Sequence, residues 1–466
     1  MKQDSPGPPS PNGRRERREE DGRADRRSSG ALLLTSPTPE PTGGADEQRR
    51  AAKHSTELDP LAALPNDLPD IRSIFSTDTF YPTEHVVSKR GVFFRGNLRG
   101  DAGQLLQRLS NRLALSFADR YTLSVLEGDE DGKALVLVEP SDIARQRYLA
   151  RKGVRRWPTP EEALPVFGSV MFFTMTLLTV IARAALAIRV QWPEVQRVTA
   201  LQGAAHLFVW FGLYAAVTQA AQRWIARRNQ ARLGIPMVLP SYEFGTFGVI
   251  SHIDRSPPTR AAVFDIAAAG SGIGLIGGLL LFMLGLVLTS LSIGMGVDPS
   301  SEMLLEQTSY VYVQHEFLFQ RSFLLGLLAR AFLRLQTVSW PQAVARSAQY
   351  AGVVMVHPLA FAGASLVLVA ALGLVPLRQL DGWRIVASLY GRRTASVASR
   401  FTILFLLIAA GASPHWLWFL VLVLFGPWRV DRHARDEVTE PDDRRTWLGF
   451  GLLLLMALTL TPFPKT

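Results

Sequence analysis

Long apolar runs separated by charged connections fill the chain from about residue 163 onward, whereas the first third is mostly polar. About 20 helical residues, each rising about 1.5 Å, cross the hydrocarbon layer of a membrane. The pattern therefore predicts a polytopic α-helical membrane protein. The predicted spans are 163–182, 198–221, 266–291, 351–377 and, starting at Trp447, 447–460 or a little beyond.

Two further apolar segments are ambiguous. Segment 317–335 is apolar on one side and carries Arg321, Arg330 and Arg334, so it either spans obliquely or lies at the interface. Segment 401–428 is interrupted by Ser-Pro-His at 413–415, which leaves two short halves. The total expected is six to eight spans.

The N-terminal segment 1–60 is rich in Pro, Gly, Ser and Arg, and its acidic and basic residues alternate. Such a segment buries too little apolar surface to offset its ordering entropy, so it is predicted to be disordered. Acidic residues such as Glu16 and Glu19 are unusual in organellar transit peptides, and the segment lacks the apolar core of a secretory signal. A bacterial protein fits this pattern better than an imported one.

Residues 61–150 have the composition of a small soluble domain, which a basic, proline-bearing linker at 151–162 connects to the apolar region 163–466. RGVFFRGNLRG (90–100) predicts a strand that ends in a tight turn at Gly96-Asn97. Helical spacing follows over 101–117, and then come two alternating β-prone runs around GDEDG at 128–132. The order strand, helix, strand, strand predicts an α+β ferredoxin-like domain.

Composition narrows the classes of function. The 466 residues carry a formal net charge of +10, and 48% are hydrophobic. The basic residues cluster beside apolar spans, which favours contact with anionic lipid and argues against nucleic acid as a partner. There is no cysteine, so disulfides and thiolate metal sites are excluded.

A glycine-rich string, GSGIGLIGG, lies inside the predicted span 266–291. Gly272, Gly274 and Gly277 match GxGxxG, but a phosphate loop needs a preceding strand and a polar mouth. Spacings of four, from Gly270 to Gly274 and on to Gly278, instead favour close approach of helix backbones.

Several strings taken together resemble site-2 proteases, the intramembrane zinc metalloproteases, in their plant and cyanobacterial branch, which includes the ethylene-dependent gravitropism-deficient and yellow-green proteins. They are FRGNLRG (94–100), PSYEFGTFGVISH (240–252), VFDIAAAGSGIG (263–274), VHPL (356–359) and QLDGWR (379–384). The resemblance covers roughly 71–462. It implies that 163–466 is a site-2-protease-like transmembrane domain.

The resemblance places the family's HExxH motif at Thr218, Gln219 and Gln222, and its LDGG motif at Asp381. In an active relative two histidines bind zinc and the glutamate activates water. Here a hydroxyl and an amide stand at the histidine positions, and Gln219 cannot act as a base. No catalytic residue, metal or cofactor is therefore expected, the alternative being zinc in an active site with unorthodox ligands.

Asp381 has two interpretations. It is a vestigial ligand that lines a cavity, or a buried acid neutralised by Arg378 or Arg384; the second is favoured. Trp383 stands at a glycine position of the motif and is expected to fill space that zinc and a peptide bond need.

Recognition without cleavage remains open. The resemblance identifies Phe244, Gly245, Thr246, Phe247 and Gly248 as part of a β-prone segment that pairs with an unwound client strand. A re-entrant hairpin that merely packs is an equal alternative.

We therefore expect a catalytically inactive homologue that binds or scaffolds membrane protein clients in the lipid bilayer. The alternatives are a working intramembrane metalloprotease and a channel or transporter; the absence of a repeated half argues against the last. The expected location is a bacterial, cyanobacterial plasma or thylakoid membrane, with a chloroplast membrane as the alternative.

Overall fold

The computed structural model describes residues 63–88, 90–128, 133–151, 163, 166–176, 178, 194–241, 245–294, 311–314, 322–335, 353–412, 414–426 and 431–462. The predicted disordered tail 1–60 and all but the first residue of the predicted linker lie outside these ranges.

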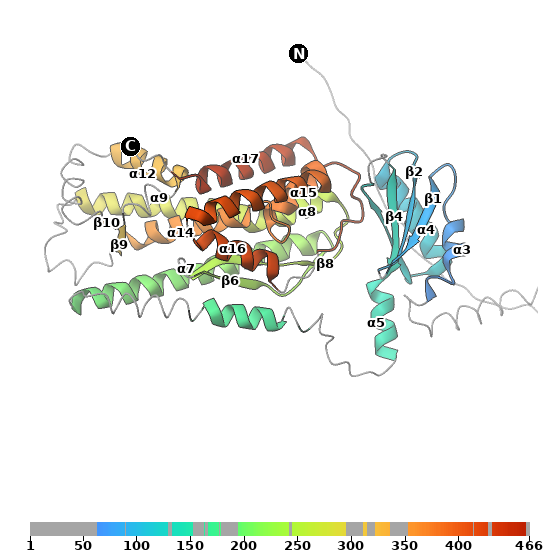
Figure 1. The fold of residues 1–466 in the computed structure, drawn as a ribbon, viewed down its shortest axis with the longest axis horizontal. Helices are drawn as coiled ribbons and strands as arrows, with labels where there is room; N and C mark the ends of the chain where they lie inside the picture. The colour runs from blue at the N-terminus through green and yellow to red at the C-terminus, as the bar shows by residue number, and fades with distance from the viewer. Residues whose placement is uncertain are drawn as a thin grey trace, which may run out of the picture. The chain divides into compact units, whose positions relative to one another are not determined.

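An N-terminal α+β domain follows (Figure 1). Its elements are α3 (Leu68–Ser73), β1 (Phe80–Val87), β2 (Val92–Leu98), α4 (Ala102–Phe117), β3 (Tyr121–Leu126), β4 (Ala134–Pro140) and α5 (Asp142–Arg151). The four strands form one sheet in the order β1-β2-β4-β3, and all neighbouring strands are antiparallel.

Strand β4 lies between β2 and β3, so β2, α4 and β3 form a split βαβ unit of the kind found in ferredoxin-like folds. Leu105, Leu109 and Leu113 of α4 are buried in the core under the sheet, as their spacing predicts. Strand β1 was not predicted, because it is an edge strand whose residues are mostly exposed and therefore lack the alternation that marks a half-buried strand.

The predicted turn at Gly96-Asn97 is wrong. Both residues lie inside β2 and pair with Pro82 and Tyr81 of β1, and the positive φ, 97°, belongs to Gly100. A Cβ atom built on Gly96 would lie 2.1 Å from the carbonyl oxygen of Tyr81. The glycine is therefore needed for close approach of two backbones rather than for a turn.

The second part of the chain is mainly helical (Figure 1). Its longer helices are α7 (Glu194–Arg228), α8 (Arg260–Ala267), α9 (Ile273–Gly294), α12 (Phe323–Leu335), α14 (Pro358–Gly373), α15 (Asp381–Ala412), α16 (Pro414–Phe425) and α17 (Asp443–Leu460). Short strands form three two-stranded sheets: β5 (Arg232–Leu233) with β8 (Ile253–Arg255), β6 (Met237–Ser241) with β7 (Gly245–Ile250), and β9 (Val311–Gln314) with β10 (Val353–Val356). A π-helical turn, η1 (Ala268–Gly272), joins α8 to α9.

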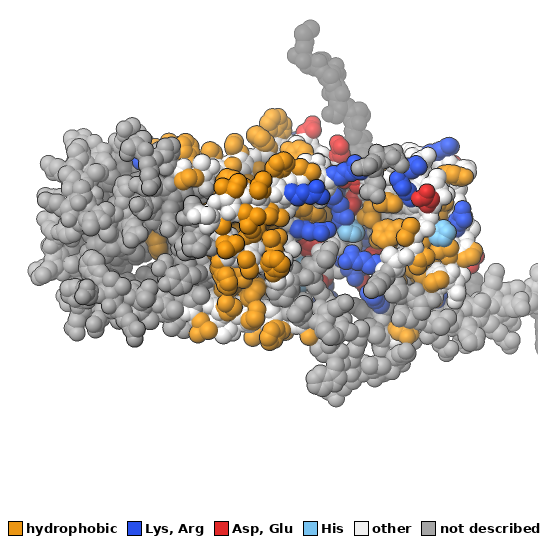
Figure 2. All heavy atoms as spheres, viewed as in Figure 1, with side chains coloured by type: hydrophobic (Ala, Val, Ile, Leu, Met, Phe, Trp, Pro, Cys, Tyr) orange, Lys and Arg blue, Asp and Glu red, His pale blue; other side chains and the backbone are white. Residues whose placement is uncertain are grey.

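Among the described residues, two helical stretches are long and apolar enough to cross a membrane, judged by length and composition: Arg260–Thr289 and Asp381–Gly411. In the second, only 11% of the apolar window is buried inside the protein. Phe401, Phe405 and Ile408 are among its exposed side chains, and Figure 2 shows a broad hydrophobic face over this part of the molecule. Such a face is satisfied by lipid rather than by water.

Helix α15 corrects the predicted arrangement of 401–428. One helix runs from Asp381 to Ala412, with a break at Gly391, where φ is 84°, and α16 follows separately. The first third of α15 was missed because Arg384, Arg392 and Arg393 interrupt its apolar pattern. The predicted span 351–377 is likewise divided, since strand β10 precedes the 16-residue helix α14.

Glycines allow close contact between the helices. A Cβ on Gly278 would lie 2.9 Å from the backbone nitrogen of Val367 in α14, and one on Gly274 would lie 2.5 Å from the ring of Tyr214 in α7. The glycine string therefore lies within helix–helix contacts, as its spacing predicts. Helix α14 starts at Pro358, and the His357 ring caps it by accepting from the Leu359 N–H.

Substitution of Gly96 tests the close pairing of β1 and β2. Gly96→Ala should lower the free energy of opening of β2 by about 1–3 kcal/mol, because the added methyl group collides with the Tyr81 carbonyl. Hydrogen exchange of β2 peptides in the full chain measures this. Gly103→Ala is the control, since its Cβ would make only an ordinary 3.5 Å contact; equal exchange in the two variants would contradict this role for Gly96.

Candidate functional site

Helix α7 and the start of α15 bring together two of the sequence-predicted positions. Gln222 Nε2 donates to Asp381 Oδ2 at 2.9 Å, and both side chains are buried. Thr218 lies one turn earlier on the same helix face but does not join them, because its hydroxyl donates back to the Tyr214 carbonyl at 2.8 Å. The three positions are therefore close in space but form no common ligand set.

Gln219 extends the hydrogen-bond network toward the β6–β7 hairpin. Its Nε2 donates to Gln222 Oε1 at 3.0 Å, and its Oε1 accepts from the Ser251 hydroxyl at 2.5 Å. Ser251 directly follows β7 and is itself buried. The residue at the position of the catalytic base thus connects α7 to the end of the hairpin.

Ser271 of η1 supplies a second donor to Asp381 Oδ2, at 2.8 Å. Two glycines make room for this arrangement. A Cβ on Gly270 would lie 1.8 Å from Gln222 Nε2, and one on Gly373 would lie 2.6 Å from the Ser271 hydroxyl. The polar side chains of Gln222 and Ser271 therefore occupy the space next to the carboxylate.

Arg384 is the buried cation of the site, and only 2% of its side chain is exposed. It donates to Asp381 Oδ1 at 2.8 Å and holds Asp431 through two bonds of 2.8 and 3.1 Å. A further donor reaches the Ser251 carbonyl. Of the two predicted partners of Asp381, Arg384 is therefore confirmed, while Arg378 is exposed and lines a neighbouring cavity.

These residues do not fit a zinc ion. Both oxygens of Asp381 accept hydrogen bonds from the protein, Gln222 presents an amide N–H to it, and the Thr218 hydroxyl is engaged with backbone. Zinc needs about four N, S or O ligands. Within the described part of the chain, no group of three or more His, Cys, Asp or Glu residues is arranged to hold a metal.

Trp383 was predicted to fill the space next to Asp381, but it is not among the described side chains that hydrogen-bond to that carboxylate. The described side chains hydrogen-bonded to that carboxylate are Gln222, Ser271 and Arg384, whereas Trp383 is half-buried and lines the neighbouring cavity. Sequence reasoning missed Ser271 as a partner of Asp381, because the two lie 110 residues apart in the chain. Asp431 gave no signal, because it lies 47 residues beyond Arg384.

The predicted strand-binding segment lies in β7, except for Phe244, which is outside the described residues. The register between β6 and β7 shifts at Phe247, which bulges and packs its ring 5.2 Å from that of Phe419 in α16. Gly248 follows with φ 115° and lies against Val369 of α14. The Thr246 hydroxyl bonds to Leu239 and Gly248 backbone. These side chains pack inside the protein, so only the backbone edge of β7 is suited to pair with a client.

Comparison with known proteins identifies the relatives of this chain. Residues 201–410 match the family model described as Peptidase family M50, and residues 69–147 match one described as EGY3 middle domain. The chain is 28% identical over 412 residues to "Probable zinc metalloprotease EGY2, chloroplastic" from Arabidopsis thaliana, covering 88% of this chain and 67% of that one. It is 26% identical to "Probable zinc metallopeptidase EGY3, chloroplastic" over 411 residues, 86% of this chain and 66% of the relative, from the same organism.

A third relative, "Probable zinc metalloprotease EGY1, chloroplastic" from Arabidopsis thaliana, is 26% identical over 87% of this chain and 73% of its own length. The chain therefore spans about two thirds of the length of the first two relatives and somewhat more of the third. No solved structure matches it. The chain contains a Peptidase family M50 (site-2 protease) domain, whose family is membrane-embedded, and is homologous to the EGY proteins.

Arg384 provides a test of the buried network. Arg384→Met leaves Asp381 and Asp431 without their shared cation, so it should destabilise the protein by about 3–5 kcal/mol. Thermal unfolding in detergent measures the loss. Arg393→Met, an exposed change on the same helix, should leave the unfolding temperature almost unchanged; equal effects would show that the ion pairs contribute little.

Proposed function

We propose that this protein is a catalytically inactive member of the family that binds or scaffolds membrane protein clients without cleaving them. The observation that carries the proposal is the occupied carboxylate of Asp381, whose two oxygens accept from Gln222, Ser271 and Arg384. An active site of this family needs that carboxylate, two imidazoles and a base around a metal ion. Here neutral side chains hold the same elements together through hydrogen bonds.

The alternative is a working zinc metalloprotease with unorthodox ligands. It is supported by the names of the relatives, which describe zinc metalloproteases. The direct hydrogen bond between Gln222 and Asp381 weighs against it, since a metal between the two positions would have to separate them.

Six to eight spans and an embedded hairpin remain our proposal for the domain.

For its location we propose a chloroplast membrane, because the relatives' names include the word chloroplastic. The bacterial location inferred from residues 1–60 is the competing proposal. Fractionation of tagged protein in a plant cell and in a cyanobacterium distinguishes the two.

Metal content tests the inactive assignment. The unmodified protein should purify without stoichiometric zinc and should hydrolyse no peptide bond, because Thr218 and Gln222 are poor zinc ligands and Gln219 is no base. Zinc-to-protein ratios measured beside a relative with HExxH give the comparison. One tightly held zinc together with chelator-sensitive cleavage would establish the alternative.

Stepwise restoration shows what blocks the site. Thr218→His with Gln219→Glu and Gln222→His should bind zinc only weakly, because Ser271 and Arg384 still hold Asp381. Adding Ser271→Ala frees one acceptor, and the zinc affinity should then rise severalfold. Trp383→Gly added instead should have the smaller effect, since Trp383 lines the other cavity. The opposite order would show that steric crowding by the indole matters more.

Crosslinking tests client binding at the hairpin. A photoreactive residue in place of half-buried Val249 should form adducts with other membrane proteins if β7 pairs with client strands. The same residue in place of buried Phe247 is the control and should react with α16, near Phe419. Adducts confined to lipid or to this chain from both positions would favour a packing role for the hairpin.

A further inference from the structure

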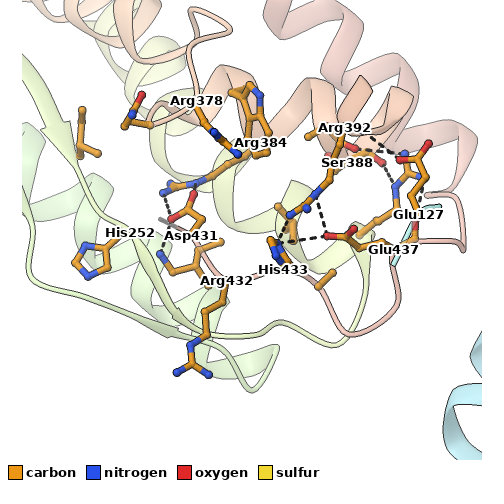
Figure 3. A pocket seen from close by; sticks show the side chains of 18 of the residues that line it. Glu127, His252, Arg378, Arg384, Ser388, Arg392, Asp431, Arg432, His433 and Glu437 are labelled. Carbon is orange, nitrogen blue, oxygen red and sulfur yellow. Dashed lines mark hydrogen bonds and ion pairs between the residues drawn. The ribbon is translucent and has the colours of Figure 1, made fainter. Parts of the chain in front are cut away.

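A cavity of about 110 Å³ lies on the far side of Arg384 from Asp381 and does not include the degenerate motif positions. It is formed by the start of α8, the start of α15, strand β8 and the segment 431–437 (Figure 3). Five arginines and three carboxylates line it: Arg260, Arg378, Arg384, Arg392 and Arg432, with Glu127, Asp431 and Glu437.

The carboxylates of the cavity are already engaged. Asp431 pairs with Arg384 at 2.8 Å, Glu437 pairs with Arg392 at 3.2 Å, and Glu127 accepts from the backbone N–H of Arg392. Figure 3 shows the Arg384 pair on one side of the cavity and the Arg392 pair on the other. Burial also raises the pKa of Glu437, while the Arg392 cation lowers it.

Two arginines of the cavity are not neutralised in this way. Arg260 is buried, and its guanidinium donates to the backbone carbonyls of Ser388, Ala387 and Glu437. Arg378 is exposed and makes no hydrogen bond or ion pair with a residue that the structure describes. The cavity therefore has an excess of positive charge.

His433, another lining residue, responds to that charge. Burial, followed by the cations of Arg392, Arg90 and Arg378, lowers its pKa to about 3. The ring is therefore neutral near pH 7, and it lies in direct contact with the Arg392 guanidinium. A neutral imidazole next to several cations is the state expected where the local potential favours an anion.

The remaining walls suit an amphipathic ligand. Gln379 Oε1 is buried with no hydrogen-bond partner among the described residues, and rotation of that amide by 180° would turn its NH₂ group to the same place. Met237, Ile250, Ile253 and the Trp383 ring supply apolar surface beside the arginines. A ligand with an anionic head and an apolar body matches both kinds of wall.

The cavity lies at the starts of the candidate membrane-crossing helices. Both candidate membrane-crossing stretches begin beside it, one at Arg260 and the other at Asp381. Figure 2 shows basic side chains next to the hydrophobic face of the molecule. Basic pockets between helices at the membrane surface bind lipid headgroups.

We propose that this cavity binds a phosphate group, with Arg378 as its principal free cation, and that the phosphate is carried by an anionic phospholipid of the surrounding bilayer. Arg260 supplies background positive charge, the Gln379 amide donates, and Trp383 with its apolar neighbours contacts the glycerol and upper acyl region. The site does not depend on whether the chain hydrolyses peptides.

Ligand-dependent thermal unfolding of the full chain in detergent tests the proposal. Three probes are titrated separately: short-chain phosphatidylglycerol, short-chain phosphatidylcholine and inorganic phosphate. Phosphatidylglycerol should raise the unfolding temperature more than phosphatidylcholine. Arg378→Gln should increase the half-maximal concentration of phosphatidylglycerol about tenfold, the effect of losing one charge-assisted hydrogen bond.

Arg393→Gln is the matched control, because Arg393 is exposed on α15 and does not line the cavity. It should leave the titration unchanged, and Arg378→Lys should restore part of the affinity. The proposed site would be contradicted if Arg378→Gln and Arg393→Gln lost equal affinity for phosphatidylglycerol, or if the two lipids stabilised the protein equally. Inorganic phosphate could also stabilise the protein as strongly as phosphatidylglycerol does, with the same dependence on Arg378. That result would contradict a phospholipid ligand and would assign free phosphate to the site.

Discussion

The buried guanidinium of Arg384 is the interaction around which the centre of the helical domain is arranged. It contacts the first residue of its own helix, the segment after α16 through Asp431, and the end of the hairpin through the Ser251 carbonyl. A charge buried to this degree is tolerated only when its donors are matched by acceptors, and here two carboxylates and a carbonyl provide them. Helix α15, the hairpin and the segment 431–437 are therefore held in one arrangement.

Around that cation, the substitutions at the family's motif positions are consistent with one another. Gln222 and Ser271 both donate to Asp381, and the missing side chains at Gly270 and Gly373 leave the room that these two residues need. A site that had merely lost its metal ligands would leave a buried carboxylate short of partners, which is unfavourable. The observed network satisfies the carboxylate with two neutral donors and the Arg384 guanidinium.

Arg384 also separates two regions with different chemistry. On one side lie the polar residues of α7 and η1, closed by hydrogen bonds, and on the other lies a cavity with free positive charge and apolar walls. Ser251 links the first region to the end of β7, because its hydroxyl donates to Gln219, which in turn donates to Gln222. The second region faces the ends of the candidate membrane-crossing helices, where headgroups are available.

The sequence by itself determined the resemblance to site-2 proteases, the α+β head and the helix contacts made by the glycine string. These features follow from short motifs and local periodicity, which depend on residues near one another in the chain. Sequence reasoning wrongly placed a turn at Gly96-Asn97. It also missed β1 and the first turns of α15, because edge strands and charged helix starts lack a clear apolar period. Only the tertiary structure decided that Arg384 rather than Arg378 pairs with Asp381, that Ser271 and Asp431 join the network, and that a basic cavity lies beside it. The contacts that Asp431, Ser271 and Gln222 make in this network join residues 47 to 159 positions apart, and such distances leave no periodic signal in a single sequence.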